Sequence, residues 1–522
     1  MPAFRKARVK PQETSGGRRR RKQAAASCCF LWILVVGSTA VPLALQAHTP
    51  PSIDSEATYR RLEQQDAEIQ WLRSRISELT ELTTAPATQA PALQRLPIPS
   101  QFTSSAASEI DALKGRLAAV EELQAAAKSD KPPGDGWVDV SNEKWTVKLG
   151  GHVQMDYVTW ANADPAIADS QNYFNFRRLR LVADGTGYAQ FDFRLQMTLE
   201  PGQGSNTSPF GSPDVKDAYL SMNEIPWIGR FRIGNFFVPF SLEQVTNDTN
   251  NMFLERSIPT QGIFAADREV GMAIYNCTDD QNISWSGGLF FDDINDTIKT
   301  RFDDNQGYRL SGRLVWLPYY DESSDGRFLL HTAIGVLHTD DQDNSVRFRA
   351  RPQVQRGPLL IDSGNLPADS YTTGNLELAV VWGRVTVQHE AFLSNVNMLS
   401  GPSVHVGGAY AHVSYFLTGE NRIYERFGQH GAQFVRNKPY TNFFAVPGYT
   451  GWGAWEAKAR WSYLDLTETN RGQYNDLTVG FNWYWSDRTR IMFDWIHPLT
   501  SSGTVFGSTE SDLIAMRFDV NW

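Results

Sequence analysis

The strict alternation at the end of the chain limits the possible folds more than any other feature. From Ile514 to Trp522 every second residue is apolar, and the residues between them are small, charged or polar. Successive side chains of a β-strand point to opposite faces, so this pattern predicts a strand with one apolar face and one polar face. Strands of soluble sandwiches show such a pattern, and so do transmembrane β-strands of about 9–11 residues.

The same alternation recurs throughout residues 137–522. In one run, Glu456, Lys458 and Arg460 share a face. Three charges on one face do not suit a dry core, but they suit a water-filled interior. About 386 residues, at roughly 24 per strand and loop, allow about 16 strands. We therefore predict an all-β fold, namely a transmembrane antiparallel β-barrel of about 16 strands.

The composition favours this barrel over the alternative, a large soluble β protein. The 522 residues have a mean hydropathy of −0.39, which is too polar for a helical membrane protein. They nevertheless include 16 Trp, 18 Tyr and 29 Phe. Many aromatic residues in a polar chain are typical of a barrel with aromatic girdles at both membrane interfaces.

The N-terminus has the pattern of an export signal. Five basic residues at 18–22 precede an apolar run that begins at Phe30, and Ala47 is a plausible cleavage point. We expect residues 1–47 to be a signal peptide and the mature protein to reach the outer membrane of a Gram-negative-type envelope. Residues 1–47 carry nine Lys or Arg and one Glu, so their removal changes the formal net charge from −9 to −17. Cys277 is then the only cysteine, which excludes an internal disulfide.

Residues 48–136 are expected to form a periplasmic coiled-coil and linker segment. Two apolar runs at heptad spacing predict helices, and a Pro/Ala/Thr-rich stretch at 85–99 separates them. Each run is short, so the helices would be marginal alone and stable in an oligomer. The alternative is a pair of helices that packs on its own chain, or a frayed linker. The heptad positions are Leu62, Ile69, Leu72, Ile76, Leu79, Ile110, Leu113, Leu117 and Val120.

Seven short motifs follow one another in an order that is typical of a known family. The most specific, residues 415–420, reads Tyr-Phe-Leu-Thr-Gly-Glu. Together the motifs resemble the phosphate-selective porin O and P family of Gram-negative outer membranes. The resemblance covers roughly residues 145–522 and implies a barrel in which inward basic residues bind anions. At one position the chain departs from the family, because Phe237 stands where members often have lysine. The motifs occupy residues 176–181, 215–219, 232–243, 254–257, 415–420, 453–456 and 480–484.

Strand parity predicts which basic residues face the lumen. Arginine keeps its charge and binds phosphate oxygens through two parallel hydrogen bonds, and several weak sites along a pore let each ion leave again. Arg177 has the opposite parity and is expected at the membrane rim. In the alternative interpretation the inward cations are ordinary lumen charges, balanced by Asp192, Glu390, Glu456 and Asp519. The predicted pore-lining and anion-binding residues are Arg178, Arg180, Arg194, Arg232, Arg309, Arg313, Lys458 and Arg460.

The sequence contains no motif for catalysis, for a metal or for a cofactor. We therefore predict a porin, not an enzyme, that passes small hydrophilic solutes passively and prefers anions such as phosphate. Its expected partners are outer-membrane lipid and two further copies in a homotrimer, with no nucleic acid. Two alternatives stay open. One is a carbohydrate-preferring porin, since Trp and Tyr stack on sugar rings, and the other is a structural protein that tethers the cell wall through residues 48–136.

Overall fold

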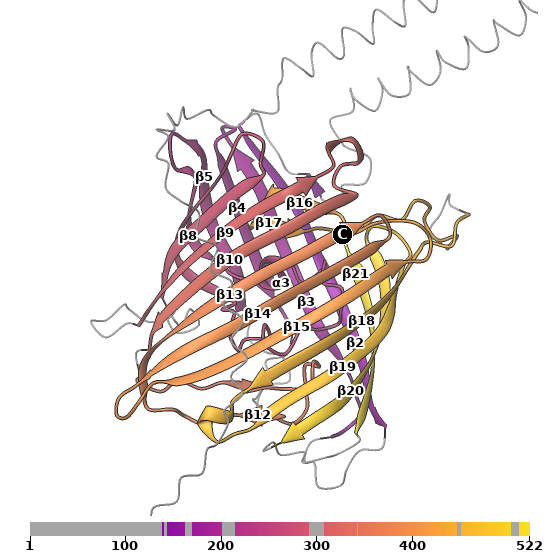
Figure 1. Cartoon of the computed structure of the whole chain (residues 1–522). Helices are drawn as coiled ribbons and strands as arrows, with labels where there is room; N and C mark the ends of the chain where they lie inside the picture. Colours follow the sequence, from indigo (N-terminus) through magenta and orange to yellow (C-terminus); the bar gives the residue numbers. More distant parts are fainter. Residues whose placement is uncertain are drawn as a thin grey trace, which may run out of the picture. The chain divides into compact units, whose positions relative to one another are not determined.

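Sixteen antiparallel strands form a closed barrel (Figure 1), which confirms the predicted fold. The computed structural model describes residues 138–139, 144–161, 170–200, 214–291, 307–341, 343–445, 450–502 and 511–522, and the predicted signal peptide and coiled-coil segment lie outside them. The barrel strands are β2 (Trp145–Ala161), β3 (Tyr173–Gly187), β4 (Phe191–Thr198), β5 (Asp214–Ile225), β6 (Gly229–Phe237), β7 (Arg268–Cys277), β8 (Ile283–Phe291), β9 (Tyr308–Tyr320), β10 (Phe328–Asp340), β13 (Ala368–Trp382), β14 (Val385–Met398), β15 (Val404–Phe416), β18 (Ala454–Asp465), β19 (Gln473–Tyr484), β20 (Thr489–Ser502) and β21 (Asp512–Asn521).

The alternating C-terminal segment is the strand that closes the barrel. β21 pairs antiparallel with β2, in a register that sets Asn521 opposite His152. The backbones of Trp522 and Gly151 extend this pairing by two reciprocal hydrogen bonds of 3.1 and 3.2 Å. A short strand, β1 (Val138–Asp139), pairs with β2 at the same end of the barrel. Each barrel strand therefore pairs with a neighbouring strand on both of its sides.

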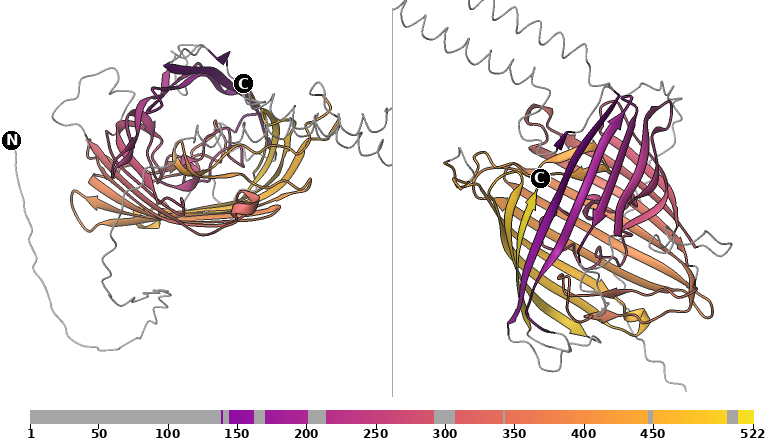
Figure 2. Two further views of the ribbon diagram at one scale, coloured as in Figure 1. Left: turned by 90° about the horizontal axis from the view of Figure 1, so that it is seen from above. Right: turned by 180° about the vertical axis from the view of Figure 1, so that it is seen from behind.

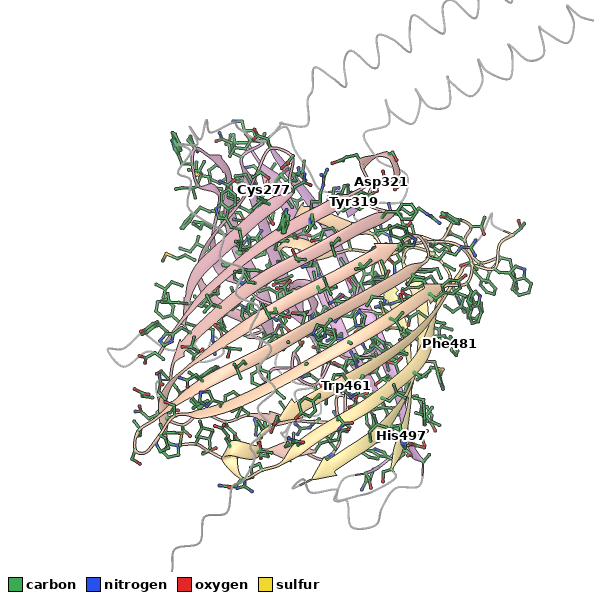
Figure 3. The ribbon with its side chains drawn as sticks, in the orientation of Figure 1. Cys277, Tyr319, Asp321, Trp461, Phe481 and His497 are labelled. Carbon is green, nitrogen blue, oxygen red and sulfur yellow. The ribbon has the colours of Figure 1, made fainter. Side chains whose placement is uncertain are left out.

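In the barrel wall, charged side chains are buried and apolar side chains are exposed, which is the reverse of the arrangement in a soluble protein. In β18, Lys458 and Arg460 face inward and are 3% and 1% exposed, whereas Trp461 faces outward and is 39% exposed. Figure 3 shows Trp461 and Phe481 on the outer surface. An apolar outer face around a charged interior is the arrangement that a barrel needs in lipid. Among the described helices, none is long and apolar enough to cross a membrane.

The two ends of the barrel differ in their connections. One end carries the C-terminus and mostly short turns, and we call it the C-terminal rim. The other end, the far rim, carries the connections that follow β2, β4, β6, β8, β10, β14, β18 and β20. The short turns of the C-terminal rim are residues 188–190, 226–228, 278–282, 321–327, 383–384 and 485–488.

Three long connections fold into the lumen (Figure 2). The first two enter from the far rim and the third enters from the C-terminal rim. The first and third meet inside the barrel, where Arg422 Nη2 donates a hydrogen bond of 3.0 Å to the carbonyl of Asn250. Their described parts that fold inward are residues 238–267, which contain α3 (Leu242–Val245); residues 343–367, which contain β11 (Arg349–Ala350) and β12 (Ile361–Asp362); and residues 417–437, which contain β16 (Tyr424–Gly428) and β17 (Gly431–Phe434).

Candidate functional site

The eight predicted cations all lie on inward positions of barrel strands, and each is at least nine-tenths buried. Two come from β3, one from β4, one from β6, two from β9 and two from β18. Every one of them lies within 4 Å of a carboxylate. The pairs are Arg178–Asp248, Arg180–Asp248, Arg194–Asp184, Arg232–Asp192, Arg309–Glu269, Arg313–Glu377, Lys458–Asp494 and Arg460–Glu243.

The four carboxylates that sequence reasoning named as counter-charges divide into two kinds. Asp192 lies 3.7 Å from Arg232, and Asp519 accepts a hydrogen bond of 2.9 Å from Arg490. Glu390 and Glu456 instead accept hydrogen bonds from neutral groups such as tyrosine hydroxyls and asparagine amides. Glu390 thus connects β14 to the neighbouring strands β13 and β15 through Asn375 and Tyr410.

The connection at 238–267, which we call the inner loop, is held in shape by its own side chains. Ser241 caps α3 at a positive φ of 68°, and its hydroxyl accepts a hydrogen bond from the N–H of Gln244. Arg256 donates to the carbonyls of Glu243, Gln244 and Thr246 at 3.0 to 3.1 Å, which satisfies the free acceptors around this helical turn. The motif at 254–257 therefore stabilises the inner loop.

The inner loop also binds opposite parts of the barrel wall. Glu255 accepts hydrogen bonds from Arg177 of β3, at 2.5 and 2.8 Å, and from Arg517 of β21, at 2.8 Å. On the other side, the N–H of Glu243 donates to the carboxylate of Glu390 of β14 at 2.8 Å. Because the loop reaches both sides, it narrows the lumen in the way that pore-lining loops set selectivity in channels.

Arg177 was expected at the membrane rim, and this expectation is wrong. The register between β2 and β3 shifts at this residue, because Gln154 pairs with Arg178 and Met155 with Phe176. A β-bulge of this kind inserts one extra residue and changes the side to which it points. Arg177 is therefore turned toward Glu255 inside the barrel. Alternation alone could not reveal the bulge.

Three arginines converge on one carboxylate of the inner loop. Guanidinium nitrogens of Arg178, Arg180 and Arg256 lie 3.2, 3.0 and 2.8 Å from Asp248. Burial favours the neutral acid, but Arg178, Arg256 and Arg180 outweigh it and hold the pKa of Asp248 well below its ordinary value. The next carboxylate, Glu200, is 3.9 Å from Arg180. We call this group the arginine cluster.

Donors without acceptors surround the arginine cluster. Among the described residues, no hydrogen-bond acceptor meets Nε of Arg180 or Nε2 of Gln154, although both atoms are buried. Both side chains come from the inward faces of β2 and β3. Buried donors that lack a partner are costly, and an oxyanion offers the acceptors that would satisfy them.

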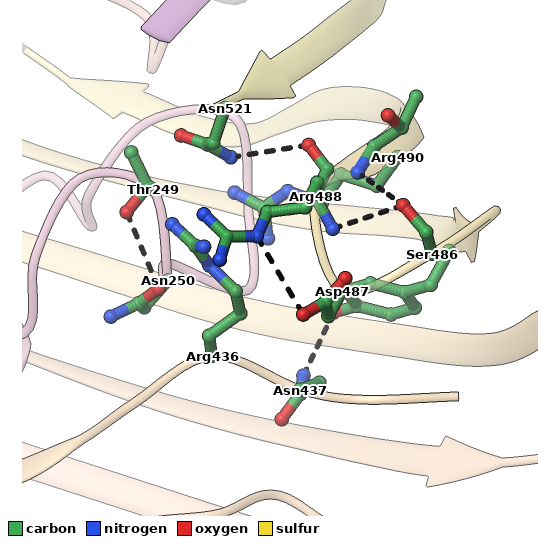
Figure 4. A pocket seen from close by; sticks show the side chains of 11 residues that line it. Thr249, Asn250, Arg436, Asn437, Ser486, Asp487, Arg488, Arg490 and Asn521 are labelled. Carbon is green, nitrogen blue, oxygen red and sulfur yellow. Dashed lines mark hydrogen bonds and ion pairs between the residues drawn. The ribbon is translucent and has the colours of Figure 1, made fainter. Parts of the chain in front are cut away.

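A second basic group lies at the C-terminal rim (Figure 4). Arg436, Arg488 and Arg490 line a pocket together with Asp487. Burial, and after it the neighbouring Arg488, lower the pKa of Arg436 below its ordinary value. The pocket also contains Asn250 of the inner loop. It is a second place where the lumen is locally basic.

Sequence reasoning missed several of these basic residues. Arg490 and Arg517 lie on the polar faces of β20 and β21, so parity could have included them. Arg256 and Arg436 lie in connections that have no regular period, and no local signal marks them as lumen residues. Their positions follow only from the way the long connections fold inward.

Comparison with known proteins identifies the group to which this lumen belongs. The sequence matches the phosphate-selective porin O and P family over residues 147–522. The chain belongs to this family. An uncharacterized protein of Caulobacter vibrioides is 27% identical over 457 residues, which cover 84% of this chain and 83% of the relative. Porin O of Pseudomonas aeruginosa is 22% identical over 401 residues, which cover 70% of this chain and 86% of the relative.

Solved porins are similar to this chain at lower identity. OmpF of Salmonella typhi, in complex with daunomycin, has a TM-score of 0.48 at 10% identity and covers 74% of this chain and 100% of its own. An anion-selective porin from Comamonas acidovorans has a TM-score of 0.43 at 13% identity and covers 72% of this chain and 99% of its own. The family and the closed barrel together indicate an outer-membrane channel and not an enzyme.

Phe237, at the position where the resemblance led us to expect a lysine, carries an aromatic ring that contacts arginines. Phe237 is fully buried, and the guanidinium carbon of Arg268 lies 3.8 Å from the centre of its ring. Arg256 approaches the same ring at 5.6 Å, and His430 at 5.0 Å. A ring face attracts cations, so Phe237 orders the side chains of the basic lumen instead of adding a charge to it.

Proposed function

We propose that this porin lets small hydrophilic solutes diffuse passively and that it prefers small oxyanions such as phosphate. The observation that supports this preference is that Arg178, Arg180 and Arg256 share the single carboxylate of Asp248. Three positive charges against Asp248 and the more distant Glu200 leave a local surplus of positive charge. In a narrow site with low-dielectric walls, such a surplus raises the local concentration of anions.

The proposed preference is mild. Each of the eight predicted cations has a carboxylate within 4 Å, so an entering anion meets groups that are already partly neutralised. Partial neutralisation lowers the affinity at each step, and weak binding is what lets an ion leave a conducting pore. The rim pocket with Arg436, Arg488 and Arg490 would give a leaving anion a second binding position.

We also propose a homotrimer whose residues 1–47 are removed on export. The heptad spacing within residues 48–136 supports an oligomer, because short amphipathic helices become stable when they pack on one another.

The selectivity can be tested in planar bilayers across a KCl gradient. We expect a reversal potential on the anion side for the wild-type porin, and a shift toward cations for the double variant Arg178→Glu and Arg180→Glu. The matched control is Arg384→Glu, because Arg384 is exposed in the two-residue turn between β13 and β14 and does not belong to a connection that enters the lumen. Absence of conductance steps would overturn the channel, and cation selectivity of the wild type would overturn the anion preference.

A further inference from the structure

An aromatic segment leaves the lumen at the C-terminal rim and lies against the outside of the barrel. We define this lateral segment as residues 438–445 and 450–453. It projects sideways from the wall beside the starts of β18 and β20 (Figures 1 and 2). Phe444 and Trp452 are 56% and 70% exposed. Large aromatic side chains held outward on a projecting element mark a contact surface.

The lateral segment is attached to the apolar outer face of the barrel. The N–H of Phe443 donates to the carbonyl of Trp485 at 2.7 Å, and the ring of Phe443 packs 4.7 Å from that of Trp483. The indole N–H of Trp483 in turn donates to the carbonyl of Trp452 at 2.9 Å. Because Trp483 and Trp485 have the outward parity of β19, these bonds fix the segment beside the lipid-facing wall.

The attachment point continues a belt of aromatic rings on the wall. Trp483 stacks on Trp455 at 4.9 Å, and Trp455 lies 5.7 Å from Phe481. The belt lies at the C-terminal rim, where β18 begins and β19 ends. Tryptophan and tyrosine collect at this level of a membrane because one part of the ring system is apolar and another is polar. Trp452 and Phe444 extend the belt away from the wall at the same level.

We propose that the lateral segment is an interfacial anchor whose partner is the phospholipid leaflet at the C-terminal rim. Phe444 and Trp452 insert into the head-group region of that leaflet. A deeper position is excluded, because irregular backbone is not tolerated where it faces hydrocarbon. The polar neighbours fit the head-group level, since Lys438, Thr441 and Thr450 are exposed and can meet phosphates and water.

Spin labels placed on the full-length porin in phospholipid vesicles test this proposal. In a background with Cys28, Cys29 and Cys277 changed to serine, single cysteines at Phe444 and Trp452 are labelled. Trp382, an exposed residue at the rim end of β13, serves as the lipid-facing control, and Ser323, in an exposed turn, serves as the aqueous control. The measured quantity is the ratio of collisions with oxygen, which dissolves in lipid, to collisions with a water-soluble nickel complex.

Insertion into the leaflet predicts the relative size of these oxygen-to-nickel collision ratios. We expect the labels at 444 and 452 to match Trp382 and to exceed Ser323 by on the order of tenfold, which corresponds to about 1.4 kcal/mol in partitioning. A ratio equal to that of Ser323 would place the segment in water and overturn the proposal. Low collision rates with both reagents would show that protein, such as a second copy of the chain, covers the segment, and this would overturn it equally.

A second experiment uses a variant that leaves the lateral segment nearly unchanged. Trp452→Phe keeps an aromatic ring, and the fluorescence difference between wild type and this variant isolates the indole of Trp452. We expect that difference to be quenched by phospholipid brominated near the head group and less by phospholipid brominated at the chain ends. A difference signal that neither lipid quenches would contradict insertion into the leaflet.

Discussion

Glu390 of β14 accepts a hydrogen bond of 2.8 Å from the backbone N–H of Glu243, at the start of α3. The same carboxylate accepts hydrogen bonds from the hydroxyl of Tyr410 at 2.5 Å and from the amide of Asn375 at 3.2 Å. One wall side chain therefore orients the first turn of the inner loop and is itself oriented by two neighbouring strands.

Replacement of Glu390 by alanine should loosen the inner loop. The change leaves the N–H of Glu243 and the hydroxyl of Tyr410 without their acceptor, and a buried unsatisfied donor costs about 1–3 kcal/mol. We expect a lower unfolding midpoint in detergent and noisier single-channel currents. Glu468→Ala is the control, because Glu468 pairs with His405 on the exposed surface, where losses are about 0.5 kcal/mol or less. Equal effects of the two variants would contradict the anchoring role.

Arg256→Lys should disturb the inner loop although the charge is kept. Arg256 reaches the carbonyls of Glu243, Gln244 and Thr246 through its planar fork of donors, and a lysine ammonium cannot reproduce that geometry. We expect a wider spread of conductance levels in planar bilayers and a lower midpoint of heat-induced mobility change on gels. Arg426→Lys, at an exposed pair with Glu322, should leave both unchanged. A single sharp level, as in the wild type, would argue against this function of Arg256.

The carboxylate of Asp248 should contribute to stability with a defined pH dependence. Its pKa is lower in the folded protein than in the unfolded chain, so its contribution is complete above about pH 3.9 and is lost as the pH falls through the folded value. The difference in unfolding free energy between wild type and Asp248→Asn should therefore stay constant from pH 7 to about 4 and shrink below. Urea titrations in detergent at several pH values measure it. A difference that vanishes between pH 7 and 5 would place the pKa above its ordinary value.

Deletion of residues 518–522 should prevent insertion of the barrel. The deletion removes the pairing between the end of β21 and the start of β2, including the two bonds between Trp522 and Gly151. Backbone groups left open to lipid cost several kcal/mol each. We expect the truncated protein to be degraded in the periplasm. Wild-type amounts of heat-modifiable protein in outer-membrane fractions would disprove a sealing role for these residues.

Periodicity was sufficient to predict the barrel and the direction of its charged side chains. In β18, alternation alone placed Lys458 and Arg460 on the inner face, because a strand that lies between lipid and water leaves no other choice. The same argument failed at Arg177, since a bulge adds one residue to β3 and resets the alternation. A bulge depends on how two strands pair, so the alternation within a single strand does not reveal it.

The arrangement of the candidate site could not be predicted from the sequence. Asp248 and Arg256 belong to a connection with no repeating pattern, and their contacts join residues that are far apart in the chain. Phe237 is a second example. In the sequence it indicates only a missing positive charge, whereas in the structure Arg268 lies over its ring, so that the ring orders arginine side chains. The sequence predicts the wall of a barrel well because the membrane imposes a rule on it, whereas no such rule applies to the lumen.

The ion pair between Asp156 and Arg517 joins the first barrel strand to the last, across 361 positions of sequence. Every other pair of neighbouring barrel strands is consecutive in the chain, so the two strands of each pair are close in sequence and can meet quickly. The ends of a chain this long meet slowly, because loop closure costs entropy and long-range pairing dominates the contact order. The time needed to complete the barrel should therefore be set by the pairing of β2 with β21, and factors that bring the two end strands together should speed folding more than factors that act on any hairpin.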